Sequence, residues 1–186
     1  MLVSSTTASM TLLGTGLSHI NRIHLFQDQL RRQRVWERPW AIRAISMAVG
    51  AAELGLGSAG MALVITQATS HQLVSTTLAM SAGLYSAFAV YAFYVLKNRP
   101  GAPCGCAPLD EPIASWVVWR AVLLAALAVA GTVGTWHGSY DPVTGSKLVI
   151  GSLAGSVTAA IIWYVPPALR LPHLPALAHR QSMTEQ

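Results

Sequence analysis

The residues with the most specific chemistry are two thiols, Cys104 and Cys106, separated by Gly105 in a proline-rich segment. The prolines stiffen this segment and remove amide donors, whereas Gly105 lets the chain fold tightly between the thiols. Alpha carbons two positions apart come within reach of a disulfide, but the small ring is strained and is therefore easily reduced. The spacing favours thiol–disulfide exchange over a permanent cross-link.

Three kinds of chemistry are open to this pair from the residues alone. The first is redox exchange, in which Arg99 and Arg120 would favour the thiolate. The second is binding of a soft ion such as Cu(I), which two thiolates suit. The third is no chemistry, with two incidental reduced cysteines. A closed structural zinc site is not expected, because it needs more ligands than this segment offers. We assign no metal, and no cofactor can be identified.

Glu53 is the second candidate, since it lies near the middle of a long apolar stretch. A carboxylate inside a membrane is costly and is usually paired or functional. Arg120 is the expected partner, because at ~1.5 Å of rise per residue its long side chain nearly bridges the difference in depth. We expect a structural ion pair, with a proton-handling role as the alternative.

The histidines are scattered and form no set with the spacing of metal ligands. His19 and His24 flank the start of the first predicted loop, so we expect loop and interface positions for them. The glycines at 55–60 match the dinucleotide-binding pattern in letters only, because they lie inside an apolar stretch without the strand and turn that this motif needs.

Composition decides which elements must position these residues. The chain has 186 residues, of which 53% are hydrophobic and 10% charged, whereas soluble chains carry about 25% charged residues. The hydrophobic residues fall in long blocks, which predicts an integral membrane protein. The net charge of +5 does not indicate nucleic-acid binding, because the basic residues flank apolar segments.

Five stretches are predicted as membrane helices, since ~20 apolar residues cross a bilayer core. Four are strongly apolar: 41–66, 73–96, 113–136 and 148–166. The fifth, 5–20, is rich in Ser and Thr, and it lacks the basic start and cleavage site of a secretory signal. The expected fold is an all-α polytopic bundle, with one domain over residues 1–170 and a cytoplasmic tail over 171–186.

Charge predicts the orientation. All but one of the basic residues fall on one side of the predicted membrane, and six arginines lie within 22–43. Basic loops stay in the cytoplasm, so we expect the cysteine loop inside a bacterial inner membrane. The segment 23–38 is predicted to be amphipathic, with Leu25, Phe26 and Leu30 as its apolar side. Its arginines are expected to set topology, with binding of anionic lipid as the alternative.

Small residues recur at helical spacing in each strongly apolar span, which lets helices approach closely in lipid. They follow one face of each span: Ser46, Gly50, Glu53, Gly57 and Gly60; Ser75, Ala79, Ala82, Ser86 and Ala89; Ala121, Ala125, Ala128, Thr132 and Thr135; and Gly151 and Gly155. We expect these faces to meet in a tight bundle.

Several of these segments together resemble one family. They are a span with a central glutamate among glycines (49–55), an aromatic-rich span (85–91), the thiols Cys104 and Cys106, and a helix that opens with Trp119 and Arg120. These features resemble the MauE branch of the DoxX-like membrane proteins, over about residues 10–165.

The resemblance implies a redox-associated membrane protein. The methylamine-utilisation protein for which the family is named helps a partner enzyme subunit mature, alongside a thioredoxin-like protein, by supporting disulfide formation. Cys104 and Cys106 would then be the redox pair, and Arg120 matches the arginine that opens the next helix. The chain departs from the family at Ala107 and Pro108, where members often continue with Phe-Gly.

We therefore predict a thiol-redox factor that supports disulfide formation or maturation of a partner protein. If it is an enzyme, its activity is of the thiol–disulfide oxidoreductase type. The expected partners are the lipid bilayer and either a thioredoxin-like protein or subunits of a membrane complex. The alternatives are a non-catalytic subunit of such a complex and a Cu(I)-binding membrane protein. Because cytoplasmic thiols face a reducing compartment, a relay across the membrane would need a second redox group.

Overall fold

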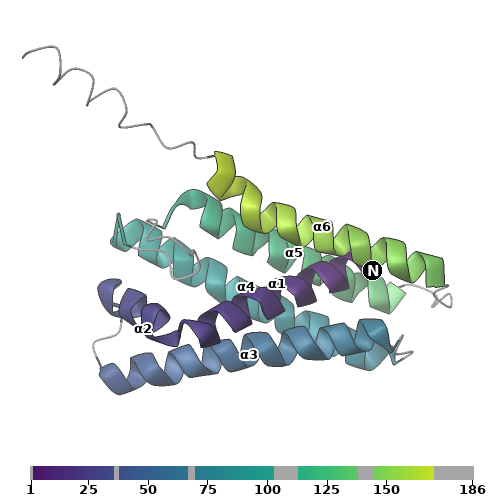
Figure 1. The fold of residues 1–186 in the computed structure, drawn as a ribbon, viewed down its shortest axis with the longest axis horizontal. Coiled ribbons are helices and arrows are strands. Elements are labelled where there is room, and N and C mark those ends of the chain that lie inside the picture. The colour runs from purple at the N-terminus through teal and green to yellow at the C-terminus, as the bar shows by residue number, and fades with distance from the viewer. Residues whose placement is uncertain (1, 36–37, 67–69, 103–112, 138–144, 170–186) are drawn as a thin grey trace, which may run out of the picture.

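The computed structural model describes residues 2–35, 38–66, 70–102, 113–137 and 145–169 of the chain. These residues form six helices and no strand (Figure 1). The helices are α1 (Leu2–Asn21), α2 (Ile23–Arg32), α3 (Pro39–Ile65), α4 (His71–Asn98), α5 (Ser115–His137) and α6 (Gly145–Leu169). The predicted all-α fold is therefore confirmed, while the predicted tail over 171–186 lies outside the described residues.

Four of the described helices, α3 to α6, are long and apolar enough to cross a membrane. They coincide with the four strongly apolar spans expected from the sequence, and their ends differ from the expected limits by only a few residues. α3 begins at Pro39, which suits the first turn because an amide there would have no partner within the helix. Ser70 caps α4, its side chain accepting a hydrogen bond from the amide of Leu73.

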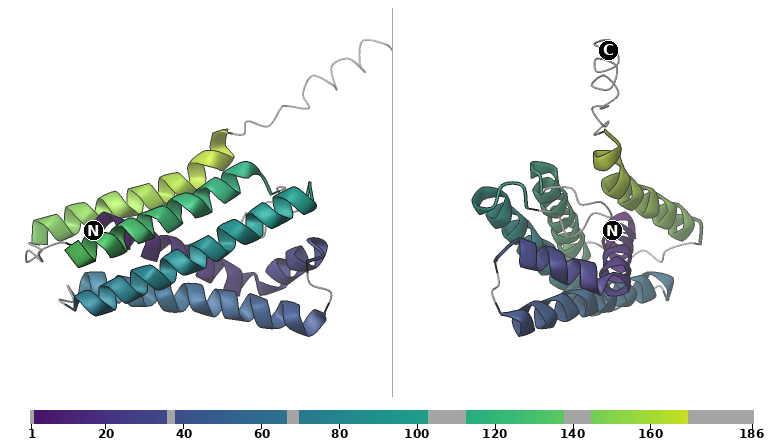
Figure 2. Two further views of the ribbon diagram at one scale, coloured as in Figure 1. Left: turned by 180° about the vertical axis from the view of Figure 1, so that it is seen from behind. Right: turned by 60° about the vertical axis from the view of Figure 1, so that its left-hand side comes forward.

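The N-terminal helix α1 lies inside the bundle. It packs against α3, α4, α5 and α6, and Figure 2 shows it between α3 and α6. Thr6, Thr7 and Leu12 on this helix are 0% exposed. The side of α1 that other helices cover need not be apolar, because its polar groups find partners within the protein, whereas Met10, Leu17 and Ile20 lie on its exposed side. The weak apolar character of the predicted span 5–20 follows from this central position.

The small residues predicted to line the inner faces are buried on three of the four helices. On α3, the whole predicted set is buried: Ser46, Gly50, Glu53, Gly57 and Gly60. On α5 and α6 the sets are buried or half-buried: Ala121, Ala125, Ala128, Thr132 and Thr135, and Gly151 and Gly155. The prediction is confirmed for these helices.

On α4 the predicted face was wrong at two positions. Ala79 and Ser86 are exposed, whereas Leu78 and Tyr85 are buried in their place. The buried residues of α4 recur mostly every three or four positions, and Leu78 and Tyr85 share this stripe with small residues such as Ala82 and Ala89. The sequence pattern of small residues alone did not reveal that a tyrosine faces the interior.

Glycines set how closely α1 approaches its neighbours. A Cβ atom added at Gly57 on α3 would lie 2.8 Å from the backbone nitrogen of Leu13, and one added at Gly155 on α6 would lie 2.7 Å from Cβ of Thr6. The hydroxyl of Thr7 donates a hydrogen bond of 3.1 Å to the carbonyl oxygen of Gly155. α1 is therefore held between two glycine faces.

α2 lies at the end of the bundle where α1 ends and α3 begins (Figure 1). Phe26 and Leu30 are buried and pack with Ile42 of α3, which confirms the amphipathic character of this segment. Leu25, predicted on the same side, is 59% exposed. Neighbouring residues on a helix point about 100° apart, so Leu25 and Phe26 cannot both face α3.

The glycine contacts between α1 and α3 yield a matched pair of variants. We expect Gly57→Ala to lower the free energy of unfolding by about 1–3 kcal/mol, because the added methyl group overlaps the backbone of α1. Gly55→Ala, two residues away, meets no atom within 4 Å and should be neutral or stabilising, since alanine favours a helix over glycine. Unfolding of both variants by SDS in mixed micelles measures the difference. Equal stability of the two variants would contradict the close contact.

Candidate functional site

The predicted thiol pair, Cys104 and Cys106, lies outside the described residues, within 103–112. The described residues on either side of this segment meet. The amide of Ile113 donates a hydrogen bond of 2.7 Å to the carbonyl oxygen of Ala102, and both residues are buried. The segment that carries the thiols therefore begins and ends at one point, where α4 ends and α5 approaches its first turn.

The base of this segment is an apolar cluster, which we call the loop base. Ala102 and Ile113 pack there with residues of α4 and α5: Ala92, Val95 and Val117. Val35, which follows α2, packs against the same cluster. Beside it, the hydroxyl of Tyr91 donates a hydrogen bond to the side-chain oxygen of Gln33. The loop base is thus joined to the segment that follows α2.

Arg120 lies on α5, about one turn beyond Trp116. Its guanidinium carbon is 5.3 Å from the centre of the Trp116 ring, in cation–π geometry. The side chain is half-buried. Thiolate support by Arg120 stays a prediction, because the thiols themselves lie outside the described residues.

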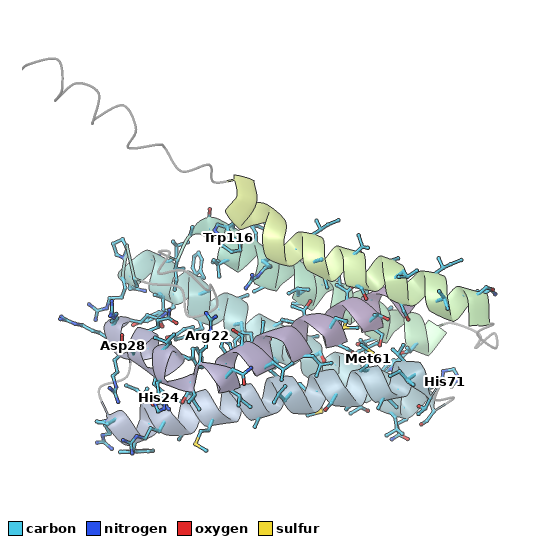
Figure 3. The ribbon with its side chains drawn as sticks, in the orientation of Figure 1. Arg22, His24, Asp28, Met61, His71 and Trp116 are labelled. Carbon is cyan, nitrogen blue, oxygen red and sulfur yellow. The ribbon has the colours of Figure 1, made fainter. Side chains whose placement is uncertain are left out.

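Figure 3 shows which labelled side chains share the end of the bundle with the loop base. Arg22, His24, Asp28 and Trp116 lie at this end, and Met61 and His71 lie at the other. The described arginines of α2 and of the first turns of α3 belong to the same end as Arg22. The thiol segment therefore leaves the bundle at its basic end.

The second site is a buried pair formed by His19 and Glu53. Nδ1 of His19 and Oε2 of Glu53 are 2.7 Å apart, and the two residues are 5% and 1% exposed. Sequence reasoning named Arg120 as the partner of Glu53 and placed His19 in a loop. The structure places His19 inside the bundle instead, because the part of α1 from Ser9 to Ile20 packs against α3.

The packing around the pair fixes the orientation of the imidazole ring. The rings of His19 and Phe26 are stacked, with centroids 4.1 Å apart and planes 14° apart. The chain turns between α1 and α2, which brings Phe26 back against His19. On the other side, a Cβ atom added at Gly16 would lie 3.0 Å from Cβ of Glu53. Close approach of α1 to α3 is therefore necessary for the pair to form.

Two further polar groups lie near the pair. Tyr85 of α4 is buried, and its hydroxyl donates a hydrogen bond of 2.9 Å to the carbonyl oxygen of Ala8. Glu53 and Arg120 both lie close enough to Tyr85 for their charges to act on its phenol. A carboxylate, an imidazole, a phenol and a guanidinium thus share the interior of the bundle.

The chemistry open to this interior is the holding and transfer of protons. Imidazole and carboxylate both take up and release protons, and paired groups of this kind inside membranes belong to proton relays or to structural ion pairs. Among the described residues, no group of three or more His, Cys, Asp and Glu side chains could hold a metal ion. Sequence reasoning missed His19. The feature that could have revealed it is its position four residues after Thr15, which places it on the same helix face as Thr7, Thr11 and Thr15.

Comparison with known proteins gives one family. The model of the family described as methylamine utilisation protein MauE matches residues 1–134. The match includes α1 to α4, the thiol segment and most of α5. No curated protein and no solved structure matches the chain.

The buried pair makes a prediction about stability. Glu53→Gln should lower the free energy of unfolding by about 1–3 kcal/mol, because it weakens the buried hydrogen bond between His19 and the carboxylate. The double variant Glu53→Gln with His19→Gln should cost less than the sum of the two single changes, since the residues interact directly. The measurement is unfolding in SDS mixed micelles.

The exposed pair of Arg32 and Asp28 is the control. Their side chains are 60% and 48% exposed, so Arg32→Gln should cost at most about 1 kcal/mol. An unchanged melting curve for Glu53→Gln would show that the pair does not hold α1 to α3.

Proposed function

The chain belongs to the MauE family of methylamine utilisation proteins, and from this premise we propose that it is a thiol-redox factor of the membrane. Cys104 and Cys106 act as the redox pair and support disulfide formation or maturation of a partner protein. The observation that carries the proposal is the Cys-Gly-Cys segment within the matched region, on a base closed by the Ala102–Ile113 hydrogen bond.

The proposed reaction is exchange in two steps. In the oxidised state, a thiolate of the partner attacks one sulfur of the Cys104–Cys106 disulfide, and the other cysteine leaves as a thiolate. A second thiol of the partner, deprotonated in its turn, then attacks the mixed disulfide. The partner gains a disulfide, and the pair on this chain is left reduced by two electrons.

The reduced pair returns to the disulfide by the same chemistry in reverse. It passes its two electrons to the disulfide of a thioredoxin-like protein, which is the second proposed partner. Atoms and electrons balance without another oxidant, because each step exchanges one disulfide for another.

The surroundings of the loop base suit this reaction. A thiolate is favoured next to cationic side chains; Arg99 directly follows α4, and Arg120 lies on α5, the helix after the segment. The spacing of two residues between the thiols brings them within reach of a strained and easily reduced disulfide. We also propose that the chain is related to the wider group of DoxX-like membrane proteins, as the resemblance of its sequence implies.

We further propose that the chain lies in the inner membrane of a bacterium with its basic end in the cytoplasm. This orientation follows from the arginines that gather at that end. It places the thiol segment on the cytoplasmic side, where the exchange partners must also be present. A non-catalytic role in a larger membrane complex and binding of Cu(I) are the competing functions.

Thiol labelling tests the proposed function. We expect a membrane-impermeant maleimide to label Cys104 and Cys106 in inverted vesicles but not in intact cells, with a fraction protected until a reductant is added. Cys104→Ser and Cys106→Ser should each remove the protected fraction, and each should abolish disulfide formation in the partner.

A cysteine at the opposite end provides the control for sidedness. Gln72 is exposed at the start of α4, so Gln72→Cys in a chain without Cys104 and Cys106 should be labelled in intact cells only. Thiols that are always fully reduced would favour the non-catalytic role. Labelling of the native pair from outside would overturn the proposed orientation, and copper bound to the purified protein would favour the Cu(I) function.

A further inference from the structure

A line of polar side chains runs along the buried face of α1 and ends at the His19–Glu53 pair. Four of its residues follow one another at four-residue intervals: Thr7, Thr11, Thr15 and His19. Each of them is at most 7% exposed. Residues at this spacing share one face of a helix. Over these positions the line is about 18 Å long, since a helix rises ~1.5 Å per residue. We call it the threonine column.

Each hydroxyl in the threonine column has a defined donor role. Thr11 donates to the carbonyl oxygen of Thr7 at 2.7 Å, and Thr15 donates to that of Thr11 at 3.0 Å. Thr7 donates to Gly155 of α6. Because a hydroxyl has one proton and two lone pairs, each oxygen can still accept a hydrogen bond.

A second observation comes from the outer end of the column. Thr6, next to Thr7, is 0% exposed, and its hydroxyl oxygen has no hydrogen-bond partner among the described residues. A buried hydroxyl without a partner costs free energy, and a water molecule is its usual partner in a protein interior. The position beside the column is therefore one at which water would be bound.

Packing alone does not explain these residue types. The closest contacts between α1 and its neighbours are made by Leu13 at Gly57 and by Thr6 at Gly155, so these contacts do not involve Thr11 or Thr15. Polar and ionisable groups inside a membrane bundle are costly, and chains of them that include His and Glu are typical of proton pathways.

We propose that His19 and Glu53 form a proton-exchange site inside the membrane, and that the threonine column is the route by which protons reach it from the N-terminal end of α1. Nδ1 of His19 is engaged with Glu53, so the exchanged proton is bound and released at Nε2 of the same ring. The carboxylate of Glu53 stabilises the imidazolium that forms. Water molecules between successive hydroxyls carry the proton, because neighbouring side chains on one helix face are about 5–6 Å apart.

The groups that face this site come from every helix packed around it. Glu53 faces it from α3, and Phe26 covers the imidazole from α2. From α4, Tyr85 lies beside the column, where its hydroxyl meets the backbone of α1 at Ala8. From α5, the charge of Arg120 reaches Tyr85, and α6 contributes the carbonyl group of Gly155. Of these groups, Glu53 is the one whose charge lies in direct contact with His19.

The test follows the protonation of His19 directly. The full-length chain, with every other histidine replaced by glutamine, is isotope-labelled in its single imidazole and reconstituted into sealed phosphatidylcholine vesicles. The pH outside the vesicles is changed rapidly, and the infrared bands of the imidazole are followed in time. We expect the bands to respond about tenfold faster when the N-terminal end of α1 faces the changed buffer than when the basic end does.

Variants of the threonine column supply the second readout. Thr11→Val and Thr15→Val keep the shape of the side chain but remove the hydroxyl, and each should slow the response about tenfold. Thr158→Val is the matched control: it removes the same kind of bond, donated to the carbonyl oxygen of Ala154, from a half-buried position on α6. It should leave the rate unchanged. Melting curves of all three variants establish that they are folded.

Three results would overturn the proposal. They are an imidazole that does not respond to the pH change, a response that is equally fast from both ends, and column variants that match Thr158→Val. The inference does not rest on the proposed thiol chemistry. A chain with Cys104→Ser and Cys106→Ser should give the same exchange rates, so failure of the redox function and failure of the proton site are distinguishable.

Discussion

The contact between α1 and α3 is the constraint on which the rest of the molecule depends. Of the described helices, α1 is one that is not apolar enough to cross a membrane alone, so its polar face is stable there only where other helices cover it. Glycines on α3 and α6 let it approach closely, and the His19–Glu53 hydrogen bond joins it to α3 in one register. A shift by one residue would turn His19 about 100° away from Glu53. The buried pair therefore specifies the packing as well as stabilising it.

α2 connects the two sites that the molecule contains. Near its start, Phe26 stacks on the imidazole of His19. After its end, Gln33 and Val35 contact Tyr91 and the loop base. The buried pair and the residues that close the thiol segment are thus joined by continuous contacts through α2. The contacts of α2 and of the residues that follow it therefore connect the buried His19–Glu53 pair to the basic end of the bundle.

Much of the fold could be predicted from the sequence, because hydropathy and charge act over long segments. The four apolar helices and the inner face of α3 were found in this way. The position of α1 against four other helices could not be predicted. Its low hydropathy is equally compatible with a helix that spans the membrane poorly and with a helix that other helices cover.

The buried sites show the same limit. Glu53 was identified by its cost in an apolar span, but its partner His19 lies 34 positions earlier in the chain. Sequence spacing does not indicate which helices will be neighbours, so Arg120 was the only cation whose depth could be compared with that of Glu53. Tyr85 was missed for a related reason, since its face is chosen by packing against α1 rather than by the small residues of α4.

The polar face of α1 also has a consequence for biogenesis. α1 is synthesised before α3 and α6, yet the partners of Thr7 and of His19 belong to those later helices. A segment of this composition gains little from entering lipid alone. Its stable insertion must therefore wait until the apolar helices have been synthesised, and the first helix of the chain is the last to reach its final position.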